Sequence, residues 1–384
     1  MNTVLKGLAF AMLMVGCSCI SKQPATPVNP SDGDEFVGTV RAPYIFEKYH
    51  DGYHTFRIPA ITITKKGTLL AFCEGRKNGG GDTGDIDLVL RRSTDGGKIW
   101  SHLIMVWDDG YNTCGNPSPV VDPVTGRIHL LMTWNLGTDG KSAGDFNNGK
   151  TTDTRRVFYT FSDDDGLTWS KAREITSQAK PDGYGWYATG PCHAIILRKG
   201  PHAGRIVVPC DCNAIGGAGY SHVIYSDDSG ANWKIGGMVS GGNESSVAEL
   251  EDGTLVLTCR TSGGKRLLAW SHDSGESFVD MVKEAALPDP TCQGSMLSTV
   301  FNGREYLLHS NCSNASGRTK MTIKTSADGG KSWSSGYLVW GGYTAYSDMV
   351  MLDDKIIGIL YENGDAGSYE RISFEKAALS YILK

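Results

Sequence analysis

Short runs rich in β-branched and aromatic residues recur along the chain, and polar turns separate them. Residues 60–64 (AITIT) alternate between hydrophobic and polar positions, while residues 155–161 (RRVFYTF) and 221–225 (SHVIY) are other short runs of this kind. Runs of this length and composition predict β-strands rather than helices. The pattern therefore predicts an all-β chain in which consecutive strands form hairpins.

One octapeptide marks several of the turns. The pattern Ser-x-Asp-x-Gly-x-x-Trp occupies residues 93–100, 162–169, 226–233 and 326–333, and a fifth copy at 271–278 ends in Phe. In a hairpin turn the Asp side chain can accept backbone N–H groups, and Gly can supply a positive φ. The aromatic ring would pack back onto its own hairpin. The copies lie about 45 to 70 residues apart, which leaves room for a four-stranded sheet, so they predict the blades of a β-propeller.

Composition and charge narrow the function classes. The chain has 384 residues, and 40% are hydrophobic, which is enough for a core and excludes a disordered chain. Its 49 glycines fit a protein with many tight turns. The formal net charge of −5 argues against nucleic acid as the main partner.

The first residues have the pattern of an export signal. Lys6 precedes the apolar run 8–15, which is too short to span a bilayer, and Cys17 follows it. The segment Met14-Val-Gly-Cys17 resembles a bacterial lipobox, which predicts a signal peptide over residues 1–17 and a lipid on Cys17. Ordinary secretion with cleavage nearby is the alternative. Residues 18–36 are rich in Pro, Ser and Asp and predict a flexible tether, and residues 37–384 remain for the propeller.

The sequence predicts no metal site and no cofactor. Eight cysteines follow the processing site, but their spacing does not specify disulfide pairs. Cys210 and Cys212 are too close for a zinc site, and no second pair completes one. The HExxH, GxSxG and phosphate-loop motifs are absent from the sequence. We expect most of these cysteines to be buried free thiols.

The segment Phe56-Arg57-Ile58-Pro59, followed by the five octapeptides, resembles the signature of bacterial exo-sialidases. The resemblance extends from about Tyr44 to the C-terminus. It implies a six-bladed propeller in which N- and C-terminal strands close the last blade. It also implies a retaining exo-α-sialidase that removes terminal α-linked sialic acid from glycoproteins, glycolipids and oligosaccharides. The expected protein is an exported monomer, anchored by lipid and facing the periplasm or the cell surface.

The resemblance further implies a group of arginines for the substrate carboxylate. Guanidinium groups suit a planar anion because they stay charged and bind carboxylates in a bidentate manner. Arg57, Arg260 and Arg318 match the three arginines of the family, and Glu362 matches the glutamate that orients the first of them. Arg76 matches a fourth arginine, near the sugar hydroxyls.

The resemblance implies a tyrosine nucleophile. The reacting carbon already bears a carboxylate, so an attacking Asp or Glu would meet like-charge repulsion, and sialidases are known to use tyrosine. Tyr346 matches the family tyrosine and Glu244 its base, whereas Tyr343 is the rival nucleophile. Glu249 lies close to Glu244 in sequence but belongs to the strand that follows.

The general acid and base is expected on the glycine-rich loop 78–87. Asp82 occupies the family position, Asp85 is the alternative, and Asp87 belongs to the next strand. Trp186 or Tyr187 could line an acetamido pocket, although core packing is the simpler interpretation of both.

Two rival functions stay open at this stage. A trans-sialidase or intramolecular trans-sialidase would share these residues and differ in its acceptor or product. A propeller that binds glycans without catalysis would share only the repeats.

Overall fold

The computed structural model describes residues 39–41, 44–140 and 142–384. The expected signal peptide (1–17), with Cys17, and the expected tether (18–36) lie outside these residues. A contact-based division of the chain begins its large compact unit at Gly38, next to the predicted boundary. No helix within the described ranges is long and apolar enough to cross a bilayer.

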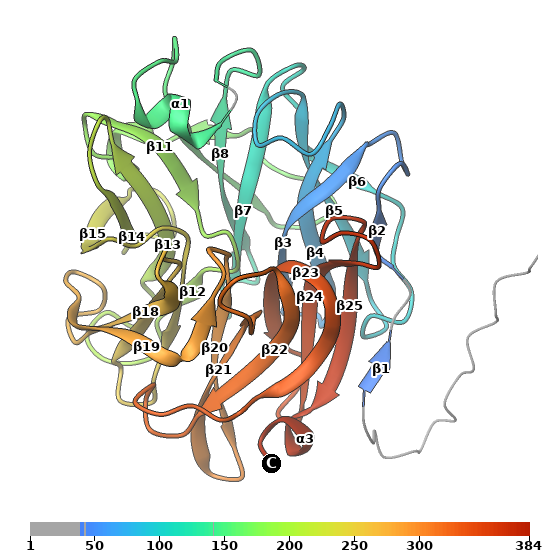
Figure 1. Ribbon diagram of the computed structural model, residues 1–384, viewed down its shortest axis with the longest axis vertical. Coiled ribbons are helices and arrows are strands. Elements are labelled where there is room, and N and C mark those ends of the chain that lie inside the picture. Colours follow the sequence, from blue (N-terminus) through green and yellow to red (C-terminus); the bar gives the residue numbers. More distant parts are fainter. Residues whose placement is uncertain (1–38, 42–43, 141) are drawn as a thin grey trace, which may run out of the picture. The chain divides into compact units, whose positions relative to one another are not determined.

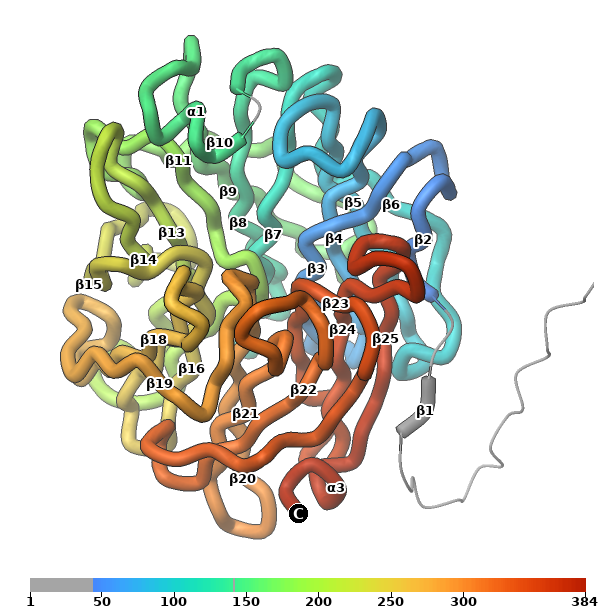
Figure 2. Tube along the Cα trace, in the orientation of Figure 1, coloured from blue at the N-terminus to red at the C-terminus, as the bar shows by residue number. Residues whose placement is uncertain are grey.

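The strands form six antiparallel blades arranged around a centre (Figures 1 and 2). Hydrogen bonds join them into sheets of eight, eight, five and four strands. Each eight-stranded sheet comprises two blades. In one of them, β5 and β7 meet only at the pair Ile86 and Thr113. In the other, the first part of β23 pairs with β22 and its second part with β24.

The blades follow one another in chain order. The first contains β3 (Thr55–Ile63), β4 (Leu69–Arg76), β5 (Ile86–Ser93) and β6 (Ile104–Trp107), and the second β7 (Thr113–Val121), β8 (Ile128–Asn135), β9 (Arg156–Ser162) and β10 (Arg173–Glu174). The third contains β11 (Tyr184–Thr189), β12 (Ile195–Ile196), β13 (Ile206–Ala214), β14 (Gly219–Ser226) and β15 (Lys234–Ser240). The fourth contains β16 (Ser245–Glu249), β17 (Leu255–Cys259), β18 (Gly264–Ser271) and β19 (Val279–Asp289). The fifth contains β20 (Ser295–Phe301), β21 (Arg304–Cys312), β22 (Thr319–Ser326) and part of β23 (Tyr337–Met351). The sixth contains the rest of β23, β24 (Ile356–Gly364), β25 (Arg371–Ala378) and the N-terminal strands β1 (Thr39–Arg41) and β2 (Phe46–Glu47). Three short helices complete the elements: α1 (Ala143–Asn147), α2 (Thr176–Ala179) and α3 (Leu379–Ile382).

The N-terminal strands close the last blade, as the sequence predicted. Both β1 and β2 pair in antiparallel fashion with β25, and the pairs include Thr39 with Ala377 and Phe46 with Ile372. A strand from each end of the chain therefore holds the ring together.

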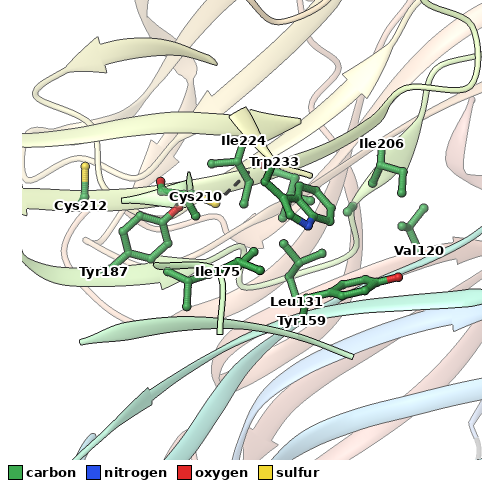
Figure 3. Packing of buried hydrophobic residues seen from close by; sticks show 14 residues of the cluster. Val120, Leu131, Tyr159, Ile175, Tyr187, Ile206, Cys210, Cys212, Ile224 and Trp233 are labelled. Atoms are coloured by element: carbon green, nitrogen blue, oxygen red, sulfur yellow. Dashed lines mark hydrogen bonds between the residues drawn. The ribbon is translucent and has the colours of Figure 1, made fainter. Parts of the chain in front are cut away.

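The hydrophobic core lies between the blades rather than in one central mass. Six clusters of buried residues each join two successive blades, and one of them joins the sixth blade to the first. Figure 3 shows the cluster between the second blade, which contributes Leu131 and Tyr159, and the third, which contributes Ile206, Ile224 and Trp233. Each fully buried large apolar side chain contributes about 1.5–3 kcal/mol to stability, so the six interfaces together stabilise the ring.

Each octapeptide lies in the turn between the third and fourth strands of its blade. In the copy at 326–333, Ser326 Oγ donates to Asp328 Oδ1 at 2.7 Å and accepts the N–H of Gly330 at 2.9 Å. Gly330 has φ +94°, a conformation that favours glycine. The same bonds recur in the other four copies. The sixth blade has no third-to-fourth hairpin, because its last strand comes from the N-terminus, and accordingly it has no copy.

The aromatic residue of the repeat differs from the expectation. We expected it to pack on its own hairpin, but Trp169 of the second blade lies edge-on to Phe72 of the first, with ring centroids 5.7 Å apart. Trp100 of the first blade meets Phe374 of the sixth in the same way at 5.4 Å. The ring therefore helps to join neighbouring blades, a contact between segments distant in sequence.

Candidate active site

A cavity of about 590 Å³ lies among the inner strands and the loops above them. All six blades contribute to its wall. Seven of the eight side chains predicted for the site line it, and the eighth, Glu362, is fully buried and bonded to one of them. The seven are Arg57, Arg76, Asp82, Glu244, Arg260, Arg318 and Tyr346.

Glu362 fixes Arg57 and the strand that carries it. The guanidinium donates from Nε to Glu362 Oε1 at 2.8 Å and from Nη2 to Oε2 at 3.3 Å. The pairing of β3 with β4 shifts between Arg57 and Ala60, and Ile58 there has φ +63°, a strained value for a β-branched residue. In this conformation the Ile58 N–H donates to Glu362 Oε1 at 2.9 Å. Glu362 Oε2 also accepts the N–H of Tyr346 at 3.0 Å, so one carboxylate connects Arg57 to the strand of the predicted nucleophile.

Tyr346, Glu244 and Arg260 form a closed triangle of contacts. The Tyr346 hydroxyl donates a short hydrogen bond to Glu244 Oε1. Arg260 Nη1 donates to Glu244 Oε2 at 2.7 Å and to the Tyr346 oxygen at 3.0 Å. Burial raises the pKa of Tyr346 well above its ordinary value, and the Glu244 charge raises it further, although Arg260 and Arg57 oppose both effects. The phenol is therefore protonated in the free site, with a base and a cation already in place.

Arg318 completes the group of arginines from the fifth blade. It donates to the Tyr369 hydroxyl at 2.6 Å and to the backbone oxygen of Thr291 at 2.8 Å. Tyr369 also lies under Arg57, whose guanidinium carbon is 4.0 Å from the ring centroid. Hence one tyrosine contacts two of the three arginines predicted to bind the carboxylate.

Asp82 lies at the rim with a side chain 53% exposed. Its Oδ1 accepts from Arg76 Nη1 at 2.9 Å and lies 4.0 Å from Arg57 Nη1. Burial alone would raise the pKa of Asp82, but the charges of Arg76, Arg57 and Arg155, with the hydrogen bond from Arg76, hold it below its ordinary value. Asp82 is thus a carboxylate that solvent can reach and that arginines surround.

Glu74, for which the sequence predicted no role, holds Arg76 from below. Arg76 donates to Glu74 Oε2 from Nη2 at 2.6 Å and from Nε at 3.0 Å. Glu74 Oε1 accepts the N–H of Asn116, a residue with φ +53° at a shift in register of β7. A Cβ on Gly115 would lie 2.1 Å from that same oxygen, so the close approach requires glycine. The arrangement repeats that of Glu362 with Arg57 one blade earlier.

The rival residues lie elsewhere. Asp85 pairs with Lys77 at 3.0 Å, and Tyr343 is 49% exposed on a part of β23 outside the cavity wall. Glu249 accepts the backbone N–H of Arg198 at 2.8 Å.

Of the two candidates for an acetamido pocket, only one reaches the cavity. Trp186 lines the wall, whereas Tyr187 is fully buried in the cluster between the second and third blades, where Figure 3 shows it. Core packing is therefore the right interpretation for Tyr187 alone.

Sequence reasoning missed Arg155 and Tyr369, which also line the cavity. Arg155 immediately precedes β9, and its position at the start of a strand was the only available signal. Tyr369 lies between β24 and β25, where no motif marks it.

Within the described part of the chain, no group of three or more His, Cys, Asp and Glu side chains is placed to hold a metal ion. The eight cysteines described there are all buried and free.

Comparisons with known proteins point to one family. Residues 67–360 match the family model described as a BNR repeat-like domain. A sialidase of Bacteroides fragilis is 33% identical over 363 residues, which are 87% of this chain and 64% of the relative. An exo-alpha-sialidase of Aspergillus fumigatus is 32% identical over 362 residues, which are 86% of each chain. The chain thus spans a little under two thirds of the length of the Bacteroides relative.

A solved structure extends the likeness to three dimensions. The Hadza microbial sialidase Hz136 superposes with a TM-score of 0.80 and 29% sequence identity. The match covers 88% of this chain and 68% of that structure.

Proposed function

The chain belongs to the sialidase family, and on that premise we propose that it is a retaining exo-α-sialidase. It would hydrolyse terminal α-linked sialic acids of glycoproteins, glycolipids and oligosaccharides through a sialyl-tyrosine intermediate. The observation that carries the proposal is the triangle of Tyr346, Glu244 and Arg260 on the wall of a cavity that other arginines line.

Arg57, Arg260 and Arg318 would bind the substrate carboxylate. All three line one cavity although they come from the first, fourth and fifth blades. Glu362 supports the binding by holding the Arg57 Nε and Nη2 atoms, which leaves Nη1 toward the cavity. Charged hydrogen bonds in a cavity shielded from water are stronger than the same bonds in bulk solvent.

In the first chemical step, the Tyr346 oxygen would attack the anomeric carbon while its proton passes to Glu244. The hydrogen bond between the two is already formed, so this proton needs no rearrangement. Arg260 lies 3.0 Å from the phenol oxygen and would stabilise the negative charge that develops there. An attacking group that is neutral before the reaction avoids repulsion by the substrate carboxylate.

Asp82 would donate a proton to the departing aglycone oxygen. In the second step it would remove a proton from the attacking water, while Tyr346 leaves and recovers its proton from Glu244. Two displacements at the same carbon give net retention of configuration. The exposed position of Asp82 allows it to exchange protons with solvent between these steps.

The test is turnover of a fluorogenic sialoside by the wild type, Tyr346→Phe and Tyr343→Phe. We expect the first variant to lose several orders of magnitude in kcat. The second should retain wild-type activity, because Tyr343 is exposed and lies outside the cavity wall. Full activity of Tyr346→Phe would refute the proposed nucleophile.

Product analysis separates hydrolysis from transfer. We expect free N-acetylneuraminate, released first as the α-anomer. A sialylated acceptor or a 2,7-anhydro sugar would instead identify a trans-sialidase or an intramolecular trans-sialidase. Binding of sialosides without turnover would identify a non-catalytic propeller that binds glycans.

We further propose that the protein is exported, carries a lipid on Cys17 and acts as a monomer at the periplasmic or outer face of the membrane. The support is the sequence of residues 1–17, with its short apolar run before Cys17. Cys17→Ser should move the protein from the membrane fraction to the soluble fraction.

A further inference from the structure

One arginine of the cavity has no ion pair. Arg155 is 2% exposed and lines the wall on the side of the second and third blades. Its guanidinium carbon lies 3.9 Å from the centroid of the Trp186 ring. Its Nε and Nη1 atoms have no hydrogen-bond acceptor among the described residues. Because a buried charge without partners is costly, these two N–H groups indicate a place for oxygen atoms of a bound molecule.

Beneath this arginine lies a buried lysine with no carboxylate on its ammonium. Lys180 is 7% exposed, and its Nζ donates to the backbone oxygen of Arg155 at 2.9 Å and to that of Gly185 at 2.6 Å. A third, short hydrogen bond goes to Thr154 Oγ1. An ammonium has three N–H donors, so these acceptors use all of them.

The lysine therefore joins the two chain segments that form this wall. Thr154 and Arg155 immediately precede β9 in the second blade, and Gly185 precedes Trp186 in β11 of the third. Lys180 itself lies directly after α2, outside the cavity wall. It contacts the backbone of the segments that carry Arg155 and Trp186 and cannot touch the substrate itself.

We propose that Lys180 is a positioning residue of the active site, whose ammonium holds Arg155 and Trp186 as a wall that binds the sugar. Arg155 would donate to an oxygen of the acylamino group or the glycerol chain, the parts of a sialic acid remote from its carboxylate. The inference rests on the proposed function, because it assigns these groups to the same substrate. Arg155 fits this part of the sugar because its blade lies across the ring from the fifth blade, which supplies Arg318.

The proposal gives substrate affinity a pH dependence. The titratable and charged groups around Lys180 are Asp153 and Arg155 before β9, Cys212 on β13 and Tyr187 on β11, whose hydroxyl bonds the carbonyl of Ala179. Burial lowers the pKa of Lys180 to about 7, and Arg155 lowers it as well. A neutral amine has only two N–H donors, so one of the three acceptors loses its partner as pH rises through this value. KM should therefore increase between pH 6 and pH 8.

The experiment compares Lys180→Met with Lys324→Met. Lys324 is a matched control, because it is 9% exposed and bonds one backbone oxygen, that of Ala286, away from the cavity. At pH 6 we expect Lys180→Met to raise KM about tenfold, the effect of one lost charged hydrogen bond, with kcat nearly unchanged. Its KM should no longer depend on pH between 6 and 8, whereas Lys324→Met should behave as the wild type.

A milder variant covers the case in which Lys180→Met does not fold. Thr154→Val removes one acceptor and keeps the lysine, and it should raise KM by a smaller factor. A wild-type KM at pH 6 in either folded variant overturns the proposal, as does a fall in kcat equal to the fall in kcat/KM.

Sialosides differing in one group identify the oxygen that Arg155 binds. In Arg155→Met, the KM penalty should disappear for a substrate with a 5-hydroxyl in place of the acylamino group, or for one with a shortened glycerol chain. A penalty that persists with both substrates overturns the assignment of this oxygen. If the wild type does not turn over sialosides, the proposed function fails. Calorimetric binding of N-acetylneuraminate to the same variants then decides the role of Lys180 separately.

Discussion

The hydroxyl of Tyr346 donates to Glu244 Oε1, although the two residues come from the sixth and fourth blades and lie 102 positions apart in the chain. Arg260, 16 residues after Glu244, contacts both. The pair exists only because the ring brings different blades to one cavity. A phenol of raised pKa bonded to a carboxylate is suited to lose its proton at the moment of attack, and not before.

Replacing Glu244 by Gln should abolish this proton transfer while keeping the shape of the side chain. We expect kcat for a fluorogenic sialoside to fall about 10²–10⁴-fold, the usual contribution of a general base. Glu249→Gln is the matched control, because Glu249 is also buried but bonds Arg198 and Lys199 outside the cavity. Equal kcat in the two variants would show that Glu244 is not the base.

Glu362→Gln should damage both the fold and the site. The carboxylate is fully buried and accepts hydrogen bonds from Arg57, Ile58 and Tyr346. The amide leaves the Arg57 charge without its counter-ion and turns an N–H₂ group toward donors. We expect a loss of about 3 kcal/mol in the free energy of unfolding, measured by urea titration, and a higher KM.

A result in which KM rises without loss of stability would mean that water replaces the carboxylate. Unchanged KM and stability together would contradict the role of Glu362 in holding Arg57.

The pH dependence of kcat/KM should report Asp82. The free enzyme needs this carboxyl protonated for the first step, so kcat/KM falls as pH rises through its pKa. Because Arg76, Arg57 and Arg155 hold that pKa below its ordinary value, despite burial, we expect the highest kcat/KM on the acid side of neutrality.

Arg76→Gln tests the origin of this limb of the profile. Losing the guanidinium removes both its charge and its hydrogen bond to Asp82, so the fall in kcat/KM should move to higher pH. Asp85→Asn should leave the limb in place, because Asp85 pairs with Lys77 instead. A limb that moves in Asp85→Asn and stays fixed in Arg76→Gln would transfer the acid role to Asp85.

The fold was predictable because its main signal is local. Every hydrogen bond of an octapeptide turn lies within five residues, as between Ser326 and Gly330, so the sequence alone specifies the turn. The aromatic ring was assigned to the wrong neighbour because its partner, such as Phe72 for Trp169, belongs to another blade. Local patterns predict the hairpins and leave the contacts between blades open.

The site was predictable only where a motif accompanied the residue. Arg57 and Tyr346 lie in recognisable segments, and the structure places both at one cavity. Arg155 has no such segment, and its direction depends on Lys180 and Gly185, which follow it by 25 and 30 residues. Burial without an ion pair is a property of the folded chain, so no reading of the sequence could have identified it.

A buried histidine should make stability depend on pH. His193 bonds Asp348 through Nδ1 at 2.6 Å and through its backbone N–H at 2.9 Å, while Ser295 and Ile61 donate to the same carboxylate from the fifth and first blades. Burial lowers the pKa of His193, but the charge of Asp348 and the hydrogen bond outweigh it and raise the pKa above the ordinary value.

A pKa that is higher in the folded than in the unfolded chain stabilises the fold below the unfolded value of about 6.5. That stabilisation is lost as pH rises through the folded value. The free energy of unfolding of the wild type should therefore exceed that of His193→Gln by more at pH 6 than at pH 9. Urea titrations of both proteins at the two pH values measure the difference, and the comparison cancels other groups, such as Lys180, that titrate in this range. A difference independent of pH would show that His193 is neutral throughout and that only its neutral hydrogen bonds hold Asp348.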